Sequence, residues 1–229
     1  ETVTINKSLT LLGAQRNITP NSPSPRAGGE SYLRPPVSNP MRSNLISVYT
    51  DTVTINGFLL DGNNPALAEC THTSEGVCLH ASAGVANGLD SNGVISYTYT
   101  SPVSNINISH NIIKNMNHHG VALRSMLPVP SVETGNVIQY NFFDNMNGST
   151  TDGDPNFERY GPRRAVRVSQ NHYADITNNR ITRVYLGIMA DTFSGANPGQ
   201  DVSISNNQIA AVRDGIRVWN FFQSGKLFL

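Results

Sequence analysis

The segment NINISHNIIKNM (residues 105–116) decides the fold, because three later stretches can be laid over it in register. These are VIQYNFFDNM (137–146), DITNNRITRV (175–184) and VSISNNQIAAV (202–212). One asparagine falls at the same place in all four, with an apolar residue two positions later; the asparagines are Asn111, Asn141, Asn179 and Asn207. Such recurrence predicts a stack of similar structural units instead of a single globular core.

Each repeat contains short stretches in which apolar and polar residues alternate. GVAL (120–123), AVRV (165–168) and GIRV (215–218) are examples, and GVCL (76–79) fits the same pattern. Alternation with period two predicts strands with one buried face. A second alternation precedes the repeated asparagine and an apolar pair follows it, so each repeat predicts three strands. The sequence therefore predicts an all-β solenoid of about six to seven coils, in one domain that covers residues 1–229.

Asparagine suits a corner between strands for two reasons. Its backbone tolerates left-handed dihedral angles better than that of most residues. Stacked side-chain amides can also donate and accept along a coil axis, which allows buried polar groups to be satisfied. We therefore expect the four repeated asparagines to form an internal ladder, with Phe58 at the equivalent place in an earlier coil.

The opening VTINKSLTLLGAQ (3–15) and the stretch NINISHNIIKNMNHHGVAL (105–123) resemble coils of the pectin-lyase-like superfamily. The resemblance implies a right-handed parallel β-helix with an internal asparagine ladder. It implies no single activity, because this architecture serves polysaccharide lyases, glycoside hydrolases, adhesins and inert spacers alike. In the resembled enzymes, long loops flank a substrate groove on one sheet.

Long loops beside the GVAL-type strands predict which face of the coil is functional. They are residues 14–43, 62–75, 81–103, 125–135, 147–164 and 191–200. Cys78, Ala122, Ser169 and Met189 are expected to point outward on this face, together with a predicted carbohydrate-binding set: Tyr49, His80, Arg124, Arg167, Asp191, Arg217 and Trp219. Guanidinium groups pair with uronate carboxylates and aromatic rings stack on sugars, so these residues suit an acidic polysaccharide. The alternative is an ordinary surface of paired charges.

Catalytic residues are harder to find on this face. Elimination on a uronate polymer needs a group that neutralises the carboxylate, often calcium, and a base. The resemblance to pectate lyases implies an acidic calcium cluster and a catalytic arginine there, yet Asp191 is the only outward acid on these strands. His80 is a lone base or a surface residue. The sequence thus favours a non-catalytic module with a structural, adhesive or assembly role, and a polysaccharide lyase is the alternative.

One acidic loop has the composition of a calcium site. TDGDPNFE (151–158) places Asp152, Asp154, Asn156 and Glu158 at alternate positions, and hard oxygen ligands spaced in this way can wrap a calcium ion. A solvated acidic turn is the alternative. No cofactor is required by the sequence.

Two further features concern location. Cys70 and Cys78, the two cysteines of the chain, are close enough in sequence for a disulfide, which would place the protein outside the reducing cytosol. Asn-x-Ser/Thr sequons begin at Asn6, Asn17, Asn107 and Asn147 and are candidate glycosylation sites. We expect an extracellular or cell-surface location.

Charge and hydropathy exclude two kinds of partner. Lysines plus arginines equal aspartates plus glutamates at 16 each, so nothing favours nucleic acid. No apolar run reaches the roughly 18 residues of a membrane span. The sequence opens inside a strand pattern and ends in the apolar NFFQSGKLFL (220–229). We therefore expect part of a longer extracellular protein, in which neighbouring domains or copies stack on the coil ends.

Overall fold

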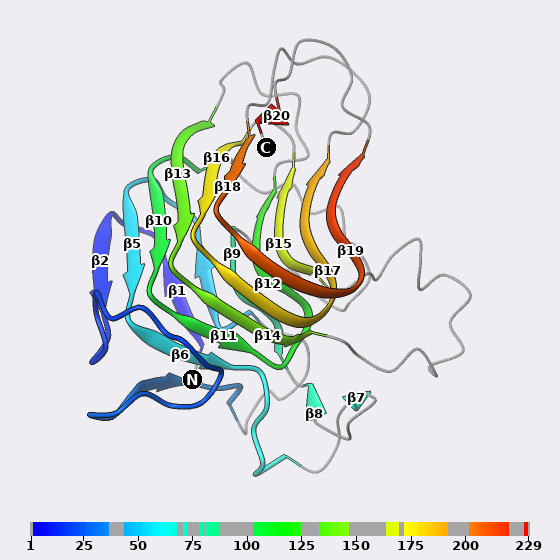
Figure 1. Cartoon of the computed structure of the whole chain (residues 1–229). Helices are drawn as coiled ribbons and strands as arrows, with labels where there is room; N and C mark the ends of the chain where they lie inside the picture. Colours follow the sequence, from blue (N-terminus) through cyan, green and yellow to red (C-terminus); the bar gives the residue numbers. More distant parts are fainter. Residues whose placement is uncertain are drawn as a thin grey trace.

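The computed structural model describes residues 2–36, 44–67, 71–72, 78–79, 81–87, 103–124, 133–146, 164–169, 172–191, 202–219 and 227–228. Each regular element in these ranges is a β-strand (Figure 1). The strands form two large curved sheets in which every pairing is parallel, and one small antiparallel pair. The prediction of an all-β, parallel, solenoid-like fold is confirmed.

The larger sheet has eleven strands and two arms. One arm contains β1 (Val3–Ile5), β4 (Ile46–Val48), β9 (Ala81–Asn87), β12 (Met116–Arg124) and β15 (Arg164–Ser169); the other contains β3 (Ser31–Leu33), β6 (Phe58–Asp61), β11 (Ile112–Lys114) and β14 (Phe142–Met146). The arms meet in β17 (Arg180–Asp191), whose first half pairs with β14 and whose second half pairs with β15. The last strand, β19 (Gln208–Trp219), pairs along the length of β17.

The second sheet has seven strands and completes each turn of the chain. Its strands, in spatial order, are β2 (Leu9–Leu12), β5 (Val53–Asn56), β10 (Ile106–Ser109), β13 (Glu133–Gln139), β16 (His172–Thr177), β18 (Val202–Ser205) and β20 (Leu227–Phe228). The chain passes from one arm to this sheet and then to the other arm, as β4, β5 and β6 illustrate. Segments that are far apart in sequence therefore lie side by side (Figure 1).

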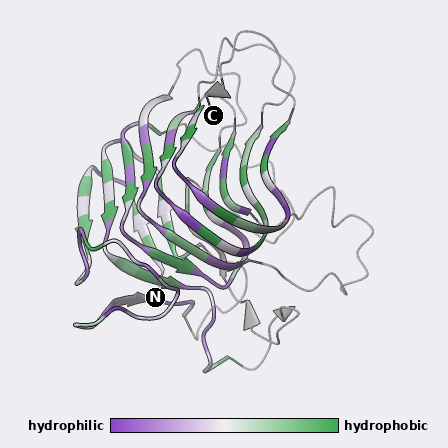
Figure 2. Ribbon diagram, in the orientation of Figure 1, coloured by the Kyte–Doolittle hydropathy of each residue, from purple (hydrophilic) through white to green (hydrophobic). Residues whose placement is uncertain are grey.

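The core lies between the sheets and is made by the alternation that the sequence contains. Ile108, Ile138 and Ile176 face inward from successive strands of the seven-stranded sheet and are buried. Phe143 and Ile181 do the same from the β14 arm. Figure 2 shows apolar residues alternating with polar ones along these strands. Each such side chain contributes about 1.5–3 kcal/mol by leaving water.

The repeated asparagines are linked by hydrogen bonds from coil to coil. Asn111 Nδ2 donates to Asn141 Oδ1 over 3.1 Å, Asn141 Nδ2 to Asn179 Oδ1 over 3.1 Å, and Asn179 Nδ2 to Asn207 Oδ1 over 3.0 Å. The same oxygens accept the backbone N–H of the preceding asparagine. Each Nδ2 also donates to a carbonyl of an earlier coil; the acceptors are Ile55, Ile108, Ile138 and Ile176. We call Asn111, Asn141, Asn179 and Asn207 the asparagine column.

The left-handed residues at this corner are the neighbours of the column. His110, Tyr140, Asn178 and Asn206 have φ values of 57°, 55°, 55° and 55°, and each precedes a column asparagine. The expectation that the column residues themselves supply the left-handed turn is therefore wrong. The bend is complete one residue earlier, so the asparagine begins the next arm with its amide directed along the stack. A left-handed non-glycine residue costs about 1–2 kcal/mol, which the packed coils offset.

Several of the expected loops overlap strands of the two large sheets. Residues 81–87 form β9, in which Val85 lies opposite Val121, so the repeat unit is GVAN (84–87) and not GVCL. Cys78 and Leu79 instead form β8 (Cys78–Leu79), which is antiparallel to β7 (Thr71–His72). Where the arms approach each other, a Cβ on Gly84 would lie 2.7 Å from the Ile113 side chain, so glycine is required at the start of this motif. Within 14–43, the strand β3 pairs with β6, and β13 begins inside 125–135.

Among the described residues, none forms a helix with the length and apolar character that crossing a bilayer would require.

Candidate functional site

The outer face of the β12 arm gathers most of the predicted carbohydrate-binding residues into two adjacent rows. In the first row, Arg167 lies between Ala122 and Met189, and Met189 lies opposite Arg217. In the second row, Ser169 lies between Arg124 and Asp191, and Asp191 lies opposite Trp219. Parallel pairing in register thus brings residues from four coils onto one face.

Arg167 and Asp191 bind each other in this face. Arg167 Nε donates to Asp191 Oδ1 over 3.1 Å, and its Nη2 to Oδ2 over 2.5 Å, a bidentate pair. Val166 and Val168, which flank Arg167 in the sequence, belong to the core, so Arg167 points away from it. The residues are nevertheless only 2% and 3% exposed, and Ala122 and Met189 are buried as well. These four positions on the outer face are therefore covered: alternation gives the direction of a side chain, not its cover.

The remaining members of the predicted set lie apart from this pair. Tyr49 is 39% exposed just beyond the end of β4, where partial burial raises the pKa of its hydroxyl. Arg217 is half-buried and forms an ion pair with Asp214, three residues earlier. For Arg124 and Trp219, the structure describes the position of the backbone in β12 and β19. His80 lies outside the described residues.

Several sequence-based predictions fall on residues that the structure does not describe. These are the calcium-site residues Asp152, Asp154, Asn156 and Glu158, the disulfide partner Cys70 and the sequon at Asn147. Within the described ranges, no group of three His, Cys, Asp or Glu residues is close enough to hold a metal ion. Of the other sequons, Asn6 is exposed and Asn107 is half-buried, whereas the Asn17 side chain accepts a 2.8 Å hydrogen bond from Asn56 Nδ2.

A second polar column lies at the opposite corner of the β6 arm, and the sequence reasoning missed it. Asn145 Nδ2 donates to Asn115 Oδ1 over 2.7 Å, and Asn115 Nδ2 donates to Asp61 Oδ1 over 2.6 Å. Asp144 binds Arg183 through a bidentate pair of 2.9 and 2.5 Å. The signal was present in the repeats: IIKNM and FFDNM both carry Asn-Met four residues after the column asparagine. Both asparagines have positive φ, so they also form the turn.

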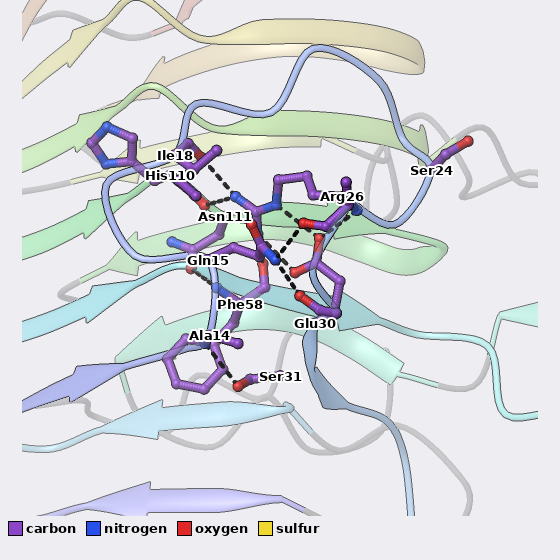
Figure 3. A network of polar contacts seen from close by, with 12 residues as sticks. Ala14, Gln15, Ile18, Ser24, Arg26, Glu30, Ser31, Phe58, His110 and Asn111 are labelled. Carbon is purple, nitrogen blue, oxygen red and sulfur yellow. Dashed lines mark hydrogen bonds and ion pairs between the residues drawn. The ribbon is translucent and has the colours of Figure 1, made fainter.

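Residues 13–30, which we call the first-coil strap, cross the outer face of the β6 arm (Figures 1 and 3). Lys114 Nζ donates to Pro23 O over 3.2 Å, and Arg180 Nη1 donates to Asn21 O over 2.7 Å, so the strap reaches strands β11 and β17. This face of the arm carries a small apolar cluster, buried outside the main core: Leu59, Ile112 and Phe142. The predicted loop 14–43 is thus in part an ordered cover.

One buried ion pair organises the strap. Arg26 Nε and Nη2 donate to the two carboxylate oxygens of Glu30 over 2.8 and 2.9 Å (Figure 3). Arg26 Nη1 also donates to the carbonyls of Ile18 and His110, each over 2.7 Å. The side chains of Arg26 and Glu30 are 8% and 0% exposed. Burial, and secondarily the Arg26 charge, lower the pKa of the His110 imidazole.

Comparisons with known proteins add no family: no protein-family model, curated protein or solved structure matches the chain. The geometry is therefore the basis for assigning a function. In the described residues, several buried charged groups form ion pairs within the chain: Arg26 with Glu30, Arg167 with Asp191, Arg183 with Asp144, and Asp61 with Arg34 and Lys114. Such pairs hold strands and loops in place.

Proposed function

We propose that this chain is a non-catalytic extracellular module with a structural or assembly role at a cell surface. In this proposal it is a right-handed parallel β-helix of the pectin-lyase-like type, with about six to seven coils and the asparagine column as its internal ladder. One observation carries the assignment. Arg167 and Asp191, the charged residues most central to the face where a substrate groove was expected, are buried and bound to each other.

This observation bears on chemistry because a catalytic or binding group must reach its substrate. Neutralising a uronate carboxylate requires a cation that is free to approach it, and general base catalysis requires a group within about 3 Å of the proton. The Arg167 guanidinium already has a carboxylate partner at 2.5 Å. Exchanging that partner for a substrate would break a bidentate pair between two buried charges, which is costly.

Binding of acidic polysaccharide is a second candidate function, and a specific observation favours it. The half-buried Arg217 stands on the same strand as Trp219, and register places Trp219 in the row of Arg124. Positions two residues apart on a strand belong to the same face, so positions 217 and 219 are suited to contact one sugar chain.

A glycan array with and without calcium, together with an absorbance assay on uronate polymers, tests these proposals. A structural module gives no glycan signal and forms no unsaturated product. Salt-sensitive binding that is lost in Arg217→Ala but kept in Arg213→Ala would support the second candidate. The matched control Arg213→Ala removes an equal charge from the same strand. New ultraviolet absorbance from unsaturated uronates would contradict the non-catalytic assignment and identify a lyase.

The extracellular location has its own test, which does not depend on a ligand. We propose that Cys70 and Cys78 form a disulfide, so the denatured chain should bind no thiol reagent until it is reduced, and two equivalents afterwards. Labelling of both thiols without reductant, in protein purified from its native host, would contradict this location.

A further inference from the structure

The strap carries three hydroxyl residues that are each followed directly by a proline. They are Thr19, Ser22 and Ser24, in the stretch TPNSPSP (19–25). A proline disfavours the helical conformation in the residue before it, and it has no N–H with which to join a sheet. Residues 18–26 accordingly belong to no helix or strand. The stretch lies against the β6 arm without becoming part of it.

Backbone carbonyls hold this stretch to the rest of the molecule. Three of them accept hydrogen bonds from cationic side chains, one in the strap itself and two on strands β17 and β11. The acceptors and donors are Ile18 O with Arg26 Nη1 (2.7 Å), Asn21 O with Arg180 Nη1 (2.7 Å), and Pro23 O with Lys114 Nζ (3.2 Å). These anchors flank Thr19 and precede Ser24, so both residues stand on a segment that is held in place.

Two of the three hydroxyl groups take no part in these contacts. Thr19 and Ser24 are exposed, and neither hydroxyl hydrogen-bonds to another residue in the part of the chain that the structure describes. Figure 3 shows the Ser24 side chain pointing away from Arg26 and Glu30. Ser22 differs, because it is half-buried and its Oγ accepts from Ser24 N over 3.3 Å. The hydroxyls of Thr19 and Ser24 are thus accessible for covalent attachment.

We propose that Thr19 and Ser24 are O-glycosylation sites. Serine and threonine interleaved with proline are typical of O-glycosylated segments. A sugar is uncharged and well hydrated, so it adds to an exposed position without disturbing the ion pairs beneath the strap. This inference rests on the proposed extracellular location, because the chain must meet glycosyltransferases on its way out of the cell.

The attachment exchanges a hydroxyl proton for a sugar. The hydroxyl oxygen of Thr19 or Ser24 forms a bond to the anomeric carbon of a donor sugar that is linked to a nucleotide or lipid phosphate. The bond between that carbon and the phosphate oxygen breaks, and the phosphate leaves with the electron pair. A base of the host's transferase takes the proton. The host supplies the donor and the transferase, and this chain supplies the oxygen nucleophile.

The sequon in the same stretch is a less suitable acceptor. It begins at Asn17 and includes Thr19. Asn17 Oδ1 accepts from Asn56 Nδ2 and Asn17 N donates to Asn56 Oδ1, each over 2.8 Å. Asn56 is buried, so this reciprocal pair ties the Asn17 amide to the coil. The geometry therefore favours sugars on the hydroxyls over a sugar on Asn17.

Mass spectrometry of one tryptic peptide from protein purified from the native host tests the proposal. Cleavage after Arg16 and Arg26 releases residues 17–26, which contain the three hydroxyls and the sequon. We expect increments of hexose or N-acetylhexosamine, placed on Thr19 and Ser24 by electron-transfer fragmentation. Thr19→Val and Ser24→Ala, expressed in the same host, should each lose the sugar at the altered position. The matched control Ser22→Ala should lose none.

Three results would overturn the proposal. They are an unmodified peptide, a phosphate increment on the hydroxyls, and a sugar that N-glycosidase releases completely or that disappears in Asn17→Gln. The extracellular location is tested separately by the thiol assay on Cys70 and Cys78. An unmodified peptide from a chain with an intact disulfide would refute the glycosylation sites alone, whereas free thiols would refute the location.

A comparison with unmodified protein gives an independent readout. Protein produced in a host without O-glycosyltransferases should be cut by trypsin after Arg16 faster than native protein, because Thr19 lies three residues away and its sugar obstructs the protease. Cleavage after Lys7, which is exposed outside the strap, should be equally fast in both forms. Equal rates after Arg16 would contradict a sugar on Thr19.

Discussion

Two buried arginine–carboxylate pairs hold different parts of this molecule, and they differ in what else they bind. Arg167 and Asp191 join neighbouring parallel strands whose positions are already set by backbone pairing. Arg26 and Glu30 lie four residues apart in the strap, which has no such pairing, and Arg26 also binds the carbonyls of Ile18 and His110. The first pair neutralises charges on a sheet that is already ordered, whereas the second determines the path of a loop.

Breaking the strap pair should have the largest effect. Arg26→Ala leaves the fully buried Glu30 carboxylate without its cation, with only the backbone N–H of residue 26 still donating to it, and removes the donor of two carbonyls; we therefore expect a loss of about 3–5 kcal/mol in the free energy of unfolding. Denaturant unfolding followed by circular dichroism measures this loss, with the exposed Arg16→Ala as control. A loss no greater than that of Arg16→Ala would show that the strap is held by other contacts.

Breaking the sheet pair should cost somewhat less. Arg167→Ala removes the bidentate partner of Asp191, yet the strands remain paired, and we expect a loss of about 3 kcal/mol.

Replacing both partners of each pair by apolar residues separates the sheet pair from the strap pair. Arg167→Met with Asp191→Leu should recover most of the stability, because no buried charge remains. Arg26→Met with Glu30→Leu should recover less, because the carbonyls of Ile18 and His110 still lack a donor. Equal recovery in both double variants would remove the distinction.

The strap should also respond to pH through His110. Its folded-state pKa is lowered by burial and by Arg26, so the unfolded chain binds a proton first as pH falls. This group therefore contributes a loss of stability as pH decreases below its unfolded pKa of about 6.5, ending below the folded pKa. His110→Asn, which tolerates the left-handed backbone there, should show a smaller decrease in unfolding free energy between about pH 8 and pH 5. The same decrease in wild type and variant would exclude His110 as its source.

A third arginine–carboxylate pair should contribute least to the free energy of unfolding. Arg217 and Asp214 are partly exposed on β19, and solvent screens their attraction. Arg217→Ala should therefore cost about 1 kcal/mol or less, and the difference from wild type should shrink further in high salt. A loss as large as that of Arg167→Ala would mean that Arg217 is buried in solution by a partner.

The sequence was informative where neighbouring coils repeat one another. The alternation around Ile108, Ile138 and Ile176 predicted strands with one buried face, because that pattern depends on residue type alone. Choosing between GVCL and GVAN could not be done in this way. Both motifs begin with Gly-Val and alternate equally well, and only the pairing of Val85 with Val121 in the folded chain distinguishes them.

The candidate site was less predictable for a related reason. Alternation correctly directed Arg167 away from the core, but it contains no information about what lies over the outer face. The strap shows the same difficulty, because Arg26 binds His110, which is 84 residues away. Contacts between residues so far apart in sequence depend on the three-dimensional path of the loop, and no local pattern in residues 13–30 predicts them.

The aligned side-chain amides of the asparagine column give the stack a net dipole along its axis. The backbone amides of a parallel sheet alternate in orientation, so their dipoles largely cancel, whereas the four side-chain carbonyls of the column all receive their donors from the preceding coil. Amide dipoles of about 3.5 D each therefore add along the axis. Polarisation strengthens every bond in such an aligned series, so a coil inserted with its amide reversed would weaken its neighbours on both sides.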